Sequence, residues 1–273
     1  MSSPRSLLSL AAALIAGSLL VACPAVYPEI KTPVRVVRAG QALDPPPPND
    51  VRWIAFKGAR IPALTRDGRR WGNDLAAGLP DAYAKLTING VEALRTSIEK
   101  GTLTPSWAKS PRGNFRIQGQ DKLRVEIWDT RVFNDHPIGI KDLGSMGAYD
   151  QRGLEEIQEE CDSGATFTMS NEPAHGFVGY GLFYELRTYE AYVTRVYEES
   201  PASRLGIRPG DQIVSVDGQP VRGMAEGEVQ SRFNAPAMQG LELSLRHEDG
   251  STVTVTLKEG AVYPLFREIG AFE

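Results

Sequence analysis

Three histidines, His136, His175 and His247, decide whether the chain can carry hydrolytic chemistry. A serine hydrolase needs a histidine beside an activated nucleophile, and many zinc proteases need two histidines one helical turn apart. Neither the G-x-S-x-G nor the H-E-x-x-H pattern occurs, and no histidine has the spacing of a metal ligand. We therefore expect no enzymatic activity.

The last third of the chain has the most specific pattern in the sequence. Two β-like runs, Val193–Tyr197 and Gln212–Val216, flank a helix start at Ser200-Pro201. Asp217-Gly218 then predicts a tight turn. The succession S-P-A, G-I-x-P-G-D and I-x-x-V-D-G resembles that of bacterial PDZ domains. This resemblance implies a module that captures extended peptides and has no chemistry of its own.

The PDZ resemblance also implies how a ligand is held. An extended peptide adds a strand to an open sheet edge, and a glycine-containing loop holds its terminal carboxylate through backbone N–H groups. Residues 179–183 (G-Y-G-L-F) resemble that loop, Leu182–Leu186 the edge strand, and Ala225–Phe233 the helix opposite, where Glu226 and Gln230 would line the groove. The implied peptide-binding residues are Tyr180, Gly181, Leu182, Phe183, Tyr184, Val229 and Phe233.

The predicted helix is the weakest element of this groove. Gly227 lowers helix propensity, and Ala225 is a poor N-cap. A degenerate groove in a purely structural module is therefore an open alternative. In a working groove, we expect a bulky charged replacement of Gly181 to abolish peptide capture without unfolding the domain.

A second resemblance covers residues 60–140. The segments G-L-P-D-A-Y-A-K-L (78–86), T-L-T-P-S-W (102–107), D-K-L-R-V-E-I-W-D (121–129) and Ile138-Gly139 follow one another in the order found in C2 domains. C2 domains are calcium-dependent lipid-binding β-sandwiches. The resemblance therefore implies a sandwich that contacts phospholipid, calcium or protein.

The C2 resemblance implies a calcium site at one tip of the sandwich. Its ligands would be Asp74 and Asp81 in the first loop and Asp129 and Asp135 in the third, because calcium prefers carboxylate oxygens. The third loop departs from the family pattern, since Arg131 stands where a second aspartate is usual and would repel a cation. A calcium-independent sandwich and a weak or single calcium site both stay open.

The first 23 residues have the pattern of a secretion signal, with Arg5 ahead of an apolar run from Leu7 to Leu20. The run ends in L-V-A-C, which resembles the bacterial lipobox and implies lipidation of Cys23. We expect a lipid-anchored protein of the bacterial cell envelope, at the outer membrane facing the periplasm. An ordinary signal peptide with a chance cysteine is the alternative. Cys161 then has no disulfide partner, and we expect it to be a small buried side chain.

Composition and turn signals divide the rest of the chain. Prolines predict an extended linker over residues 24–49. Short strand patterns favour an antiparallel C2-like β-sandwich over 50–172, followed by an α/β PDZ half-open barrel over 178–262 and a tail over 263–273. The chain is thus expected to be mainly β with two domains.

Several elements of the sandwich are specific enough to test. The strand patterns are Val51–Phe56, Tyr83–Ile88, Leu123–Trp128 and Ala165–Met169. Asn89-Gly90 predicts a hairpin turn. Leu154, Ile157 and Cys161 have helical spacing, so a helix is expected over Gly153–Cys161.

The formal net charge of −4 favours no nucleic-acid partner. We expect a membrane-tethered adaptor or scaffold that captures a peptide or protein with a free C-terminus or an exposed strand. Two alternatives stay open: a regulatory accessory of an envelope protease, and a purely structural envelope component.

Overall fold

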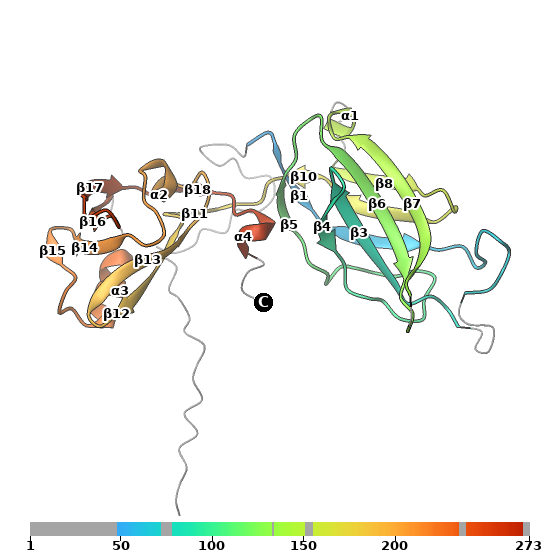
Figure 1. Cartoon of the computed structure of the whole chain (residues 1–273). Helices are drawn as coiled ribbons and strands as arrows, with labels where there is room; N and C mark the ends of the chain where they lie inside the picture. The colour runs from blue at the N-terminus through green and yellow to red at the C-terminus, as the bar shows by residue number, and fades with distance from the viewer. Residues whose placement is uncertain (1–47, 72–77, 133, 151–154, 235–238, 270–273) are drawn as a thin grey trace, which may run out of the picture.

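The computed structural model describes residues 48–71, 78–132, 134–150, 155–234 and 239–269. The predicted signal segment with Cys23, nearly all of the proline linker, and Asp74 lie outside these residues. The fold is mainly β and has two domains, which lie on the two sides of a narrow junction (Figure 1). Within the described ranges, no helix is long and apolar enough to cross a bilayer.

The first domain contains two antiparallel sheets that share one core. One sheet has the order β4-β3-β6-β7 and the other β2-β9-β8. The strands of the first are β3 (Ala82–Ile88), β4 (Val91–Arg95), β6 (Lys122–Asp129) and β7 (His136–Ser145). Those of the second are β2 (Phe56–Arg60), β8 (Glu156–Glu160) and β9 (Thr166–Ser170), and the short α1 (Gly147–Asp150) follows β7.

Strand β6 shows how the sequence produces this sandwich. Leu123, Val125 and Ile127 are buried in the core between the sheets, whereas Arg124 and Glu126 point away from it. This alternation has the period of two that places one face of a strand against a core. The predicted turn at Asn89-Gly90 is confirmed, because both residues have positive φ, 51° and 81°, and join β3 to β4.

Two predictions for this domain need correction. The predicted run Val51–Phe56 is split into β1 (Val51–Ile54) and β2, which belong to different sheets; the intervening Ala55 donates its N–H to Ser170 Oγ, 2.8 Å away. The predicted helix over Gly153–Cys161 is wrong, since Glu156–Glu160 form strand β8 paired with β9. The helical spacing depended on Leu154, which lies outside the described residues. Ile157 and Cys161 are both buried, but a separation of four suits a helix as well as a strand, so the pairing with β9 and not the spacing decides the conformation.

The second domain is a sheet of order β12-β13-β14-β16-β17 with short helices against it. Its strands are β12 (Leu182–Arg187), β13 (Glu190–Val196), β14 (Gln212–Val216), β15 (Gln219–Pro220), β16 (Leu241–Arg246) and β17 (Thr252–Leu257). Its helices are α2 (Pro201–Arg204) and α3 (Glu226–Asn234). Ser200 is the N-cap of α2 and accepts the N–H of Ser203 at 3.2 Å.

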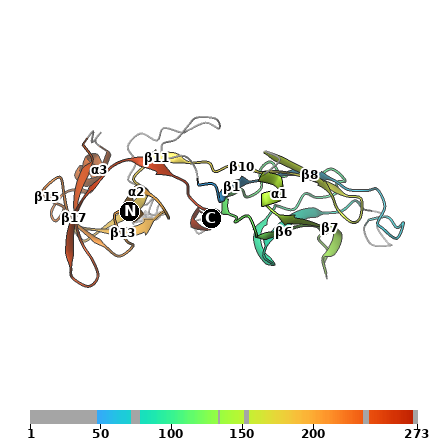
Figure 2. The same ribbon diagram turned by 90° about the horizontal axis from the view of Figure 1, so that it is seen from above.

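A continuous band of short elements joins the domains. Strands β1, β5 (Gly113–Arg116) and β10 (Glu172–Pro173) form a sheet of the first domain, and β11 (Phe177–Gly179) pairs with β18 (Gly260–Val262) beside the second. Helix α4 (Phe266–Ile269) then returns to β5, where the Phe266 ring stacks on Phe115 with centroids 5.0 Å apart. Both views show α4 between the two domains (Figures 1 and 2). The tail is therefore a docked segment as far as Ile269.

Asn114 of β5 is the central polar contact of this junction. Its Nδ2 donates to the carbonyl oxygens of His175 and Pro264, at 2.7 and 2.9 Å, and its Oδ1 accepts the N–H of His175 at 2.9 Å. The side chain is 1% exposed. One asparagine thus fixes the interdomain segment and the C-terminal tail to the same strand.

Candidate functional site

Strand β12 lies at the edge of the second domain's sheet. Among the described residues its only sheet partner is β13, with Leu182 opposite Val196 and Tyr184 opposite Val193 across a bulge. An edge strand has one row of backbone N–H and C=O groups without partners in its own sheet. Strand β12 is therefore the edge strand of this sheet over Leu182–Arg187, and the exposed fractions of Leu182 and Tyr184 are 0% and 1%.

Hydrogen bonds next to β12 show which of its residues face outward. Gly181 O accepts the N–H of Tyr197. The N–H of Val193 donates to Asp211 O and its C=O accepts the N–H of Gly210, so both groups point away from β12, toward β14. In an antiparallel ladder bonded and non-bonded pairs alternate, so the pairs that contain Leu182, Tyr184 and Leu186 are non-bonded. The backbone groups of these three residues therefore point to the open edge, where an added strand would take them.

The glycine loop stands at the start of this edge. The carbonyls of Tyr180 and Gly181 are held by the N–H groups of Ala202 and Tyr197, at 3.0 and 2.8 Å. In the described part of the chain, the N–H of Gly181 has no backbone acceptor and that of Leu182 points away from β13, although both residues are buried in this conformation. Gly181 has φ +75°, a conformation that favours glycine.

Most of the predicted peptide-binding side chains belong to the core of the domain. Tyr180, Leu182, Tyr184, Val229 and Phe233 all lie in one buried cluster. Phe183 points to the other face of β12, where it packs with Tyr197 beneath the Arg195 guanidinium. Their role in ligand binding stays a prediction, and the groups that reach the open edge are backbone groups.

Tyr184 spans the space between β12 and α3. Its ring contacts that of Phe233 with centroids 4.6 Å apart. Burial, with a smaller contribution from the nearby carboxylate of Glu226, raises the pKa of Tyr184 to about 12. The ring is therefore neutral across the physiological range and acts as an apolar part of the groove floor.

The three described aspartates of the predicted calcium site do lie at one tip of the sandwich. Asp129 Oδ1 accepts the N–H of Asp81 at 3.0 Å, and Asp81 Oδ1 accepts the N–H of Gly101 at 2.8 Å. Asp135 accepts the hydroxyls of Tyr83 and Thr130, at 2.6 and 2.9 Å, and these bonds lower its pKa, the Tyr83 bond most. The carboxylates thus have protein donors already.

Arg131 makes this set unsuitable for a cation. Its Nε donates to Asp129 Oδ2 at 2.9 Å, and the Asp129 side chain is only 4% exposed. A divalent ion at Asp129 would have to displace a fixed positive charge from a buried carboxylate. The described residues contain no cluster of three acidic, histidine or cysteine side chains with metal-binding geometry. The described loop residues therefore do not fit calcium.

We expect calcium to leave the thermal stability of the chain unchanged up to about 1 mM, a concentration that saturates extracellular-type sites. Arg131→Asn should convert the tip toward a site and make the melting temperature rise with calcium, because Asp129 loses its counter-ion. Arg66→Asn, at an exposed arginine, is the control. Differential scanning fluorimetry measures both, and saturable stabilisation of the native chain would contradict the expectation.

Sequence reasoning missed a cluster of aromatic rings and cations on the first sheet. The Lys85 ammonium lies 4.6 Å from the Trp128 ring centroid and 5.6 Å from that of Tyr83, and Arg95 lies 5.1 Å from Tyr83. Burial, followed by the Asp135 hydrogen bond, raises the pKa of Tyr83 well above its usual range. The strand alternation of β3 and β6 placed Tyr83, Lys85 and Trp128 in phase, which is the signal that could have found them.

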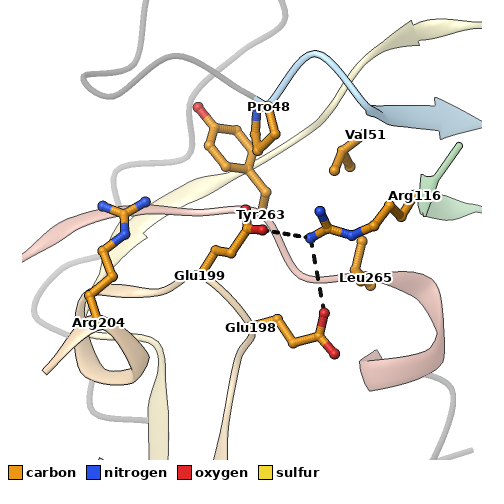
Figure 3. A pocket seen from close by; sticks show the side chains of 8 residues that line it. All are labelled: Pro48, Val51, Arg116, Glu198, Glu199, Arg204, Tyr263 and Leu265. Atoms are coloured by element: carbon orange, nitrogen blue, oxygen red, sulfur yellow. Dashed lines mark hydrogen bonds and ion pairs between the residues drawn. The ribbon is translucent and has the colours of Figure 1, made fainter. Parts of the chain in front are cut away.

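The hollow at the domain junction is lined by paired charges. It is formed by Pro48, Val51, Arg116, Glu198, Glu199, Arg204, Tyr263 and Leu265 (Figure 3). The Arg116 guanidinium reaches Glu199 of the second domain and Asp50 of the first, both at 2.9 Å. This pairing fits an interdomain contact, and the hollow offers no separate reactive group.

Cys161 is the small buried side chain that the sequence predicts. It is 4% exposed, and burial raises the pKa of its thiol to about 12. It packs against Gly139 of β7, where an added Cβ would lie 2.7 Å from the Cys161 Cβ. Glycine at position 139 therefore provides the space for this cysteine.

We expect Cys161 to react with a disulfide reagent at pH 8 roughly a hundredfold or more slowly in the folded chain than in urea, because thiolate is the reactive form. An unfolded thiol ionises above about pH 8.5, whereas the folded one stays protonated. The contribution of the buried Cys161 thiol to the free energy of unfolding is thus complete below about pH 8.5 and is lost as the pH rises toward 12. A Cys23→Ser background isolates the reaction, and equal rates would contradict burial.

Comparisons with known proteins agree with this two-part fold. Residues 192–232 match the family model of the PDZ domain, and residues 65–153 match that of the C2 domain. The chain carries a PDZ-like and a C2-like domain. The two matches agree with the PDZ and C2 resemblances predicted from the sequence.

Individual relatives cover less. The chain is 33% identical over 73 residues, 27% of its length, to the E3 ubiquitin-protein ligase RSP5 of Chaetomium thermophilum, and it spans 8% of that protein. A solved C2 domain is 20% identical, with TM-score 0.33 over 45% of this chain and 97% of that one. A structure of two C2 domains of Extended-Synaptotagmin 2 is 13% identical, with TM-score 0.37 over 83% of each chain.

Proposed function

We propose that this chain is a peptide-binding adaptor, not an enzyme, and that β12 takes up an extended peptide by strand addition. The observation that carries the proposal is the outward backbone of Leu182, Tyr184 and Leu186 next to the amide of Gly181, which has no backbone acceptor among the described residues. A strand added there gains main-chain hydrogen bonds, and the glycine loop offers N–H donors to a terminal carboxylate.

Proline at an outward position tests strand addition directly. Leu186→Pro removes a backbone N–H that points to the open edge, so the pairing with β13 is retained and peptide capture is lost. Leu186→Ala shortens the same side chain but keeps the N–H, and it should bind as the native chain does. Fluorescence anisotropy with a pool of labelled C-terminal hexapeptides measures both variants. Equal binding by the proline variant would rule out this edge.

A second experiment tests whether the glycine loop binds the C-terminal carboxylate of the peptide. Peptides with a free C-terminus should bind at least about tenfold more tightly than the same peptides with an amidated C-terminus, because a charge-assisted hydrogen bond is stronger than a neutral one. Equal affinities would mean that the edge takes internal strands and that the glycine loop plays no part.

We propose further that Cys23 carries lipid and tethers the adaptor to the bacterial outer membrane, facing the periplasm. The L-V-A-C sequence at the end of the apolar run supports this proposal. Metabolic labelling with an alkyne fatty acid should mark the native chain and leave Cys23→Ser unlabelled. Label that persists in the variant would contradict the assignment.

A second candidate function is phospholipid contact by the first domain. At the tip that holds Asp81 and Asp129, Leu79 is 52% exposed and Val132 is 90% exposed. Apolar side chains at such a tip gain free energy when they enter a bilayer interface. We expect Cys23→Ser chain to co-sediment with phosphatidylglycerol vesicles equally with calcium or chelator, and the added Val132→Asp change to reduce sedimentation. Unchanged sedimentation of that double variant would exclude the tip.

A further inference from the structure

The space between β12 and α3 is filled by the domain's own side chains. Leu182 and Val229 are 0% exposed, and Tyr184 and Phe233 are 1% exposed. The rings of Tyr184 and Phe233 meet at 4.6 Å with an interplanar angle of 37°. Strand β12 and helix α3 are thus closed against each other at the level of these rings.

An added strand would place its own side chains on top of this contact. Residues directly opposite each other in an antiparallel pair project to the same face, with Cβ atoms roughly 4.5–5.5 Å apart. Ligand residues opposite Leu182 and Tyr184 therefore point into the space between β12 and α3. Ligand residues in between point to the other face, which holds Phe183.

The floor of this space leaves little depth for a ligand side chain. Leu182, Tyr184, Val229 and Phe233 pack in the same cluster as the central strands. The Tyr184 ring reaches Phe233 in the last turn of α3, whereas Glu226, the first residue of the helix, is exposed. A large ligand side chain would have to part the Tyr184–Phe233 contact.

We propose, on the basis of the proposed function, that this groove selects extended C-terminal peptides with small residues, alanine, serine or glycine, at the two positions opposite Leu182 and Tyr184. Small side chains lie over the closed floor, whereas leucine or phenylalanine would force core rings apart, which is costly in a close-packed interior. Tyr184 and Phe233 are therefore specificity-determining residues although neither is exposed.

The test compares labelled hexapeptides with a free carboxylate on the full chain, by fluorescence anisotropy. The peptides carry alanine, leucine or phenylalanine at both the last and the third-last residue, and glycine elsewhere. The alanine peptide should bind at least about tenfold more tightly than the phenylalanine peptide, the expected cost of overpacking. Preference for leucine or phenylalanine would overturn the selectivity and leave strand addition intact.

Variants of Phe233 identify the source of the selectivity. Phe233→Ala shortens the helix side of the contact, so the leucine and phenylalanine peptides should gain affinity relative to alanine. Phe233→Leu keeps most of the apolar volume and provides a folded variant with a smaller change in the same direction. Phe167→Leu, at an equally buried ring in the core of the first domain, is the matched control and should keep the native preference. Circular dichroism melts verify that each variant is folded.

The outcomes separate the two proposals. An unchanged preference in both Phe233 variants would overturn the role of the aromatic contact. Absence of binding by every peptide, including alanine with a free carboxylate, would overturn both the selectivity and the proposed function. Binding of all three peptides with equal affinity would overturn the selectivity alone.

Discussion

Replacement of Gly181 by alanine is expected to destabilise the second domain by roughly 2–5 kcal/mol. Gly181 has φ +75°, and a Cβ there would lie 2.2 Å from the Cβ of Ser200 and 3.3 Å from Cγ2 of Val262. Two costs add up in this loss of stability: alanine must adopt a left-handed backbone conformation, and its methyl group overpacks against Ser200, the N-cap of α2. Urea denaturation followed by far-UV circular dichroism measures the loss.

A glycine with the same backbone conformation and open surroundings is the control. Gly206 has φ +78° and no atom within 4 Å of its hypothetical Cβ. Gly206→Ala should cost only about 1–2 kcal/mol, the conformational term alone. If Gly181→Ala costs no more stability than Gly206→Ala, contact with Ser200 adds no destabilisation at position 181.

Ser200→Gly provides a second check, because it removes the Cβ and Oγ that the new methyl group would meet. Alone it should cost about 1 kcal/mol, since glycine is a tolerable N-cap but the buried hydrogen bond from Ser200 Oγ to Gly181 O is lost. The two substitutions together should therefore cost less than the sum of the single changes. The close approach of position 181 to Ser200 also corrects an expectation from the sequence, namely that a bulky charged residue at position 181 would abolish peptide capture without unfolding the domain. Such a side chain would disturb the fold together with the loop.

The second domain could be predicted in detail because its signals are local. Ser200 caps α2, and Asp217 and Gly218 have the positive φ, 48° and 71°, that their turn requires. The edge strand and its neighbour also follow the sequence pattern. The alternation of Leu182 and Tyr184 showed that both share one face, but not that Phe233 would close that face.

Other features depend on partners far away in the sequence. The segment around β8 has helical spacing in the sequence, through Leu154, Ile157 and Cys161, and the pairing of β8 with β9 decides its conformation. Arg131 could be recognised as a departure from a calcium loop, but its hydrogen bond to the buried Asp129 required the folded tip. Asn114 stands in a short strand with no motif around it, and its bond to Pro264 spans 150 residues.

Asn114→Ala is expected to destabilise the chain by roughly 3 kcal/mol or more, because it leaves several buried backbone groups without hydrogen-bond partners. The carbonyl oxygens of His175 and Pro264 lose a donor, and the N–H of His175 loses an acceptor. Urea denaturation measures the free energy of unfolding. Hydrogen exchange should show the largest acceleration at His175 and in the tail near Leu265, which pairs with Asn114 through an isolated bridge.

Asn89→Gly is the matched control for this prediction. The Asn89 side chain also makes two hydrogen bonds, to Asp121 and to the N–H of Lys122, but it is exposed in a turn whose positive φ glycine retains. Its cost should stay below about 1 kcal/mol, because water replaces the lost partners. If both variants lose the same stability, Asn114 does not tie the interdomain segment and the tail to β5. If only Asn114→Ala is strongly destabilising and the tail exchanges first, this buried amide is a main anchor of the interdomain segment and of the tail, beside the Phe115–Phe266 stack and the Arg116 ion pairs.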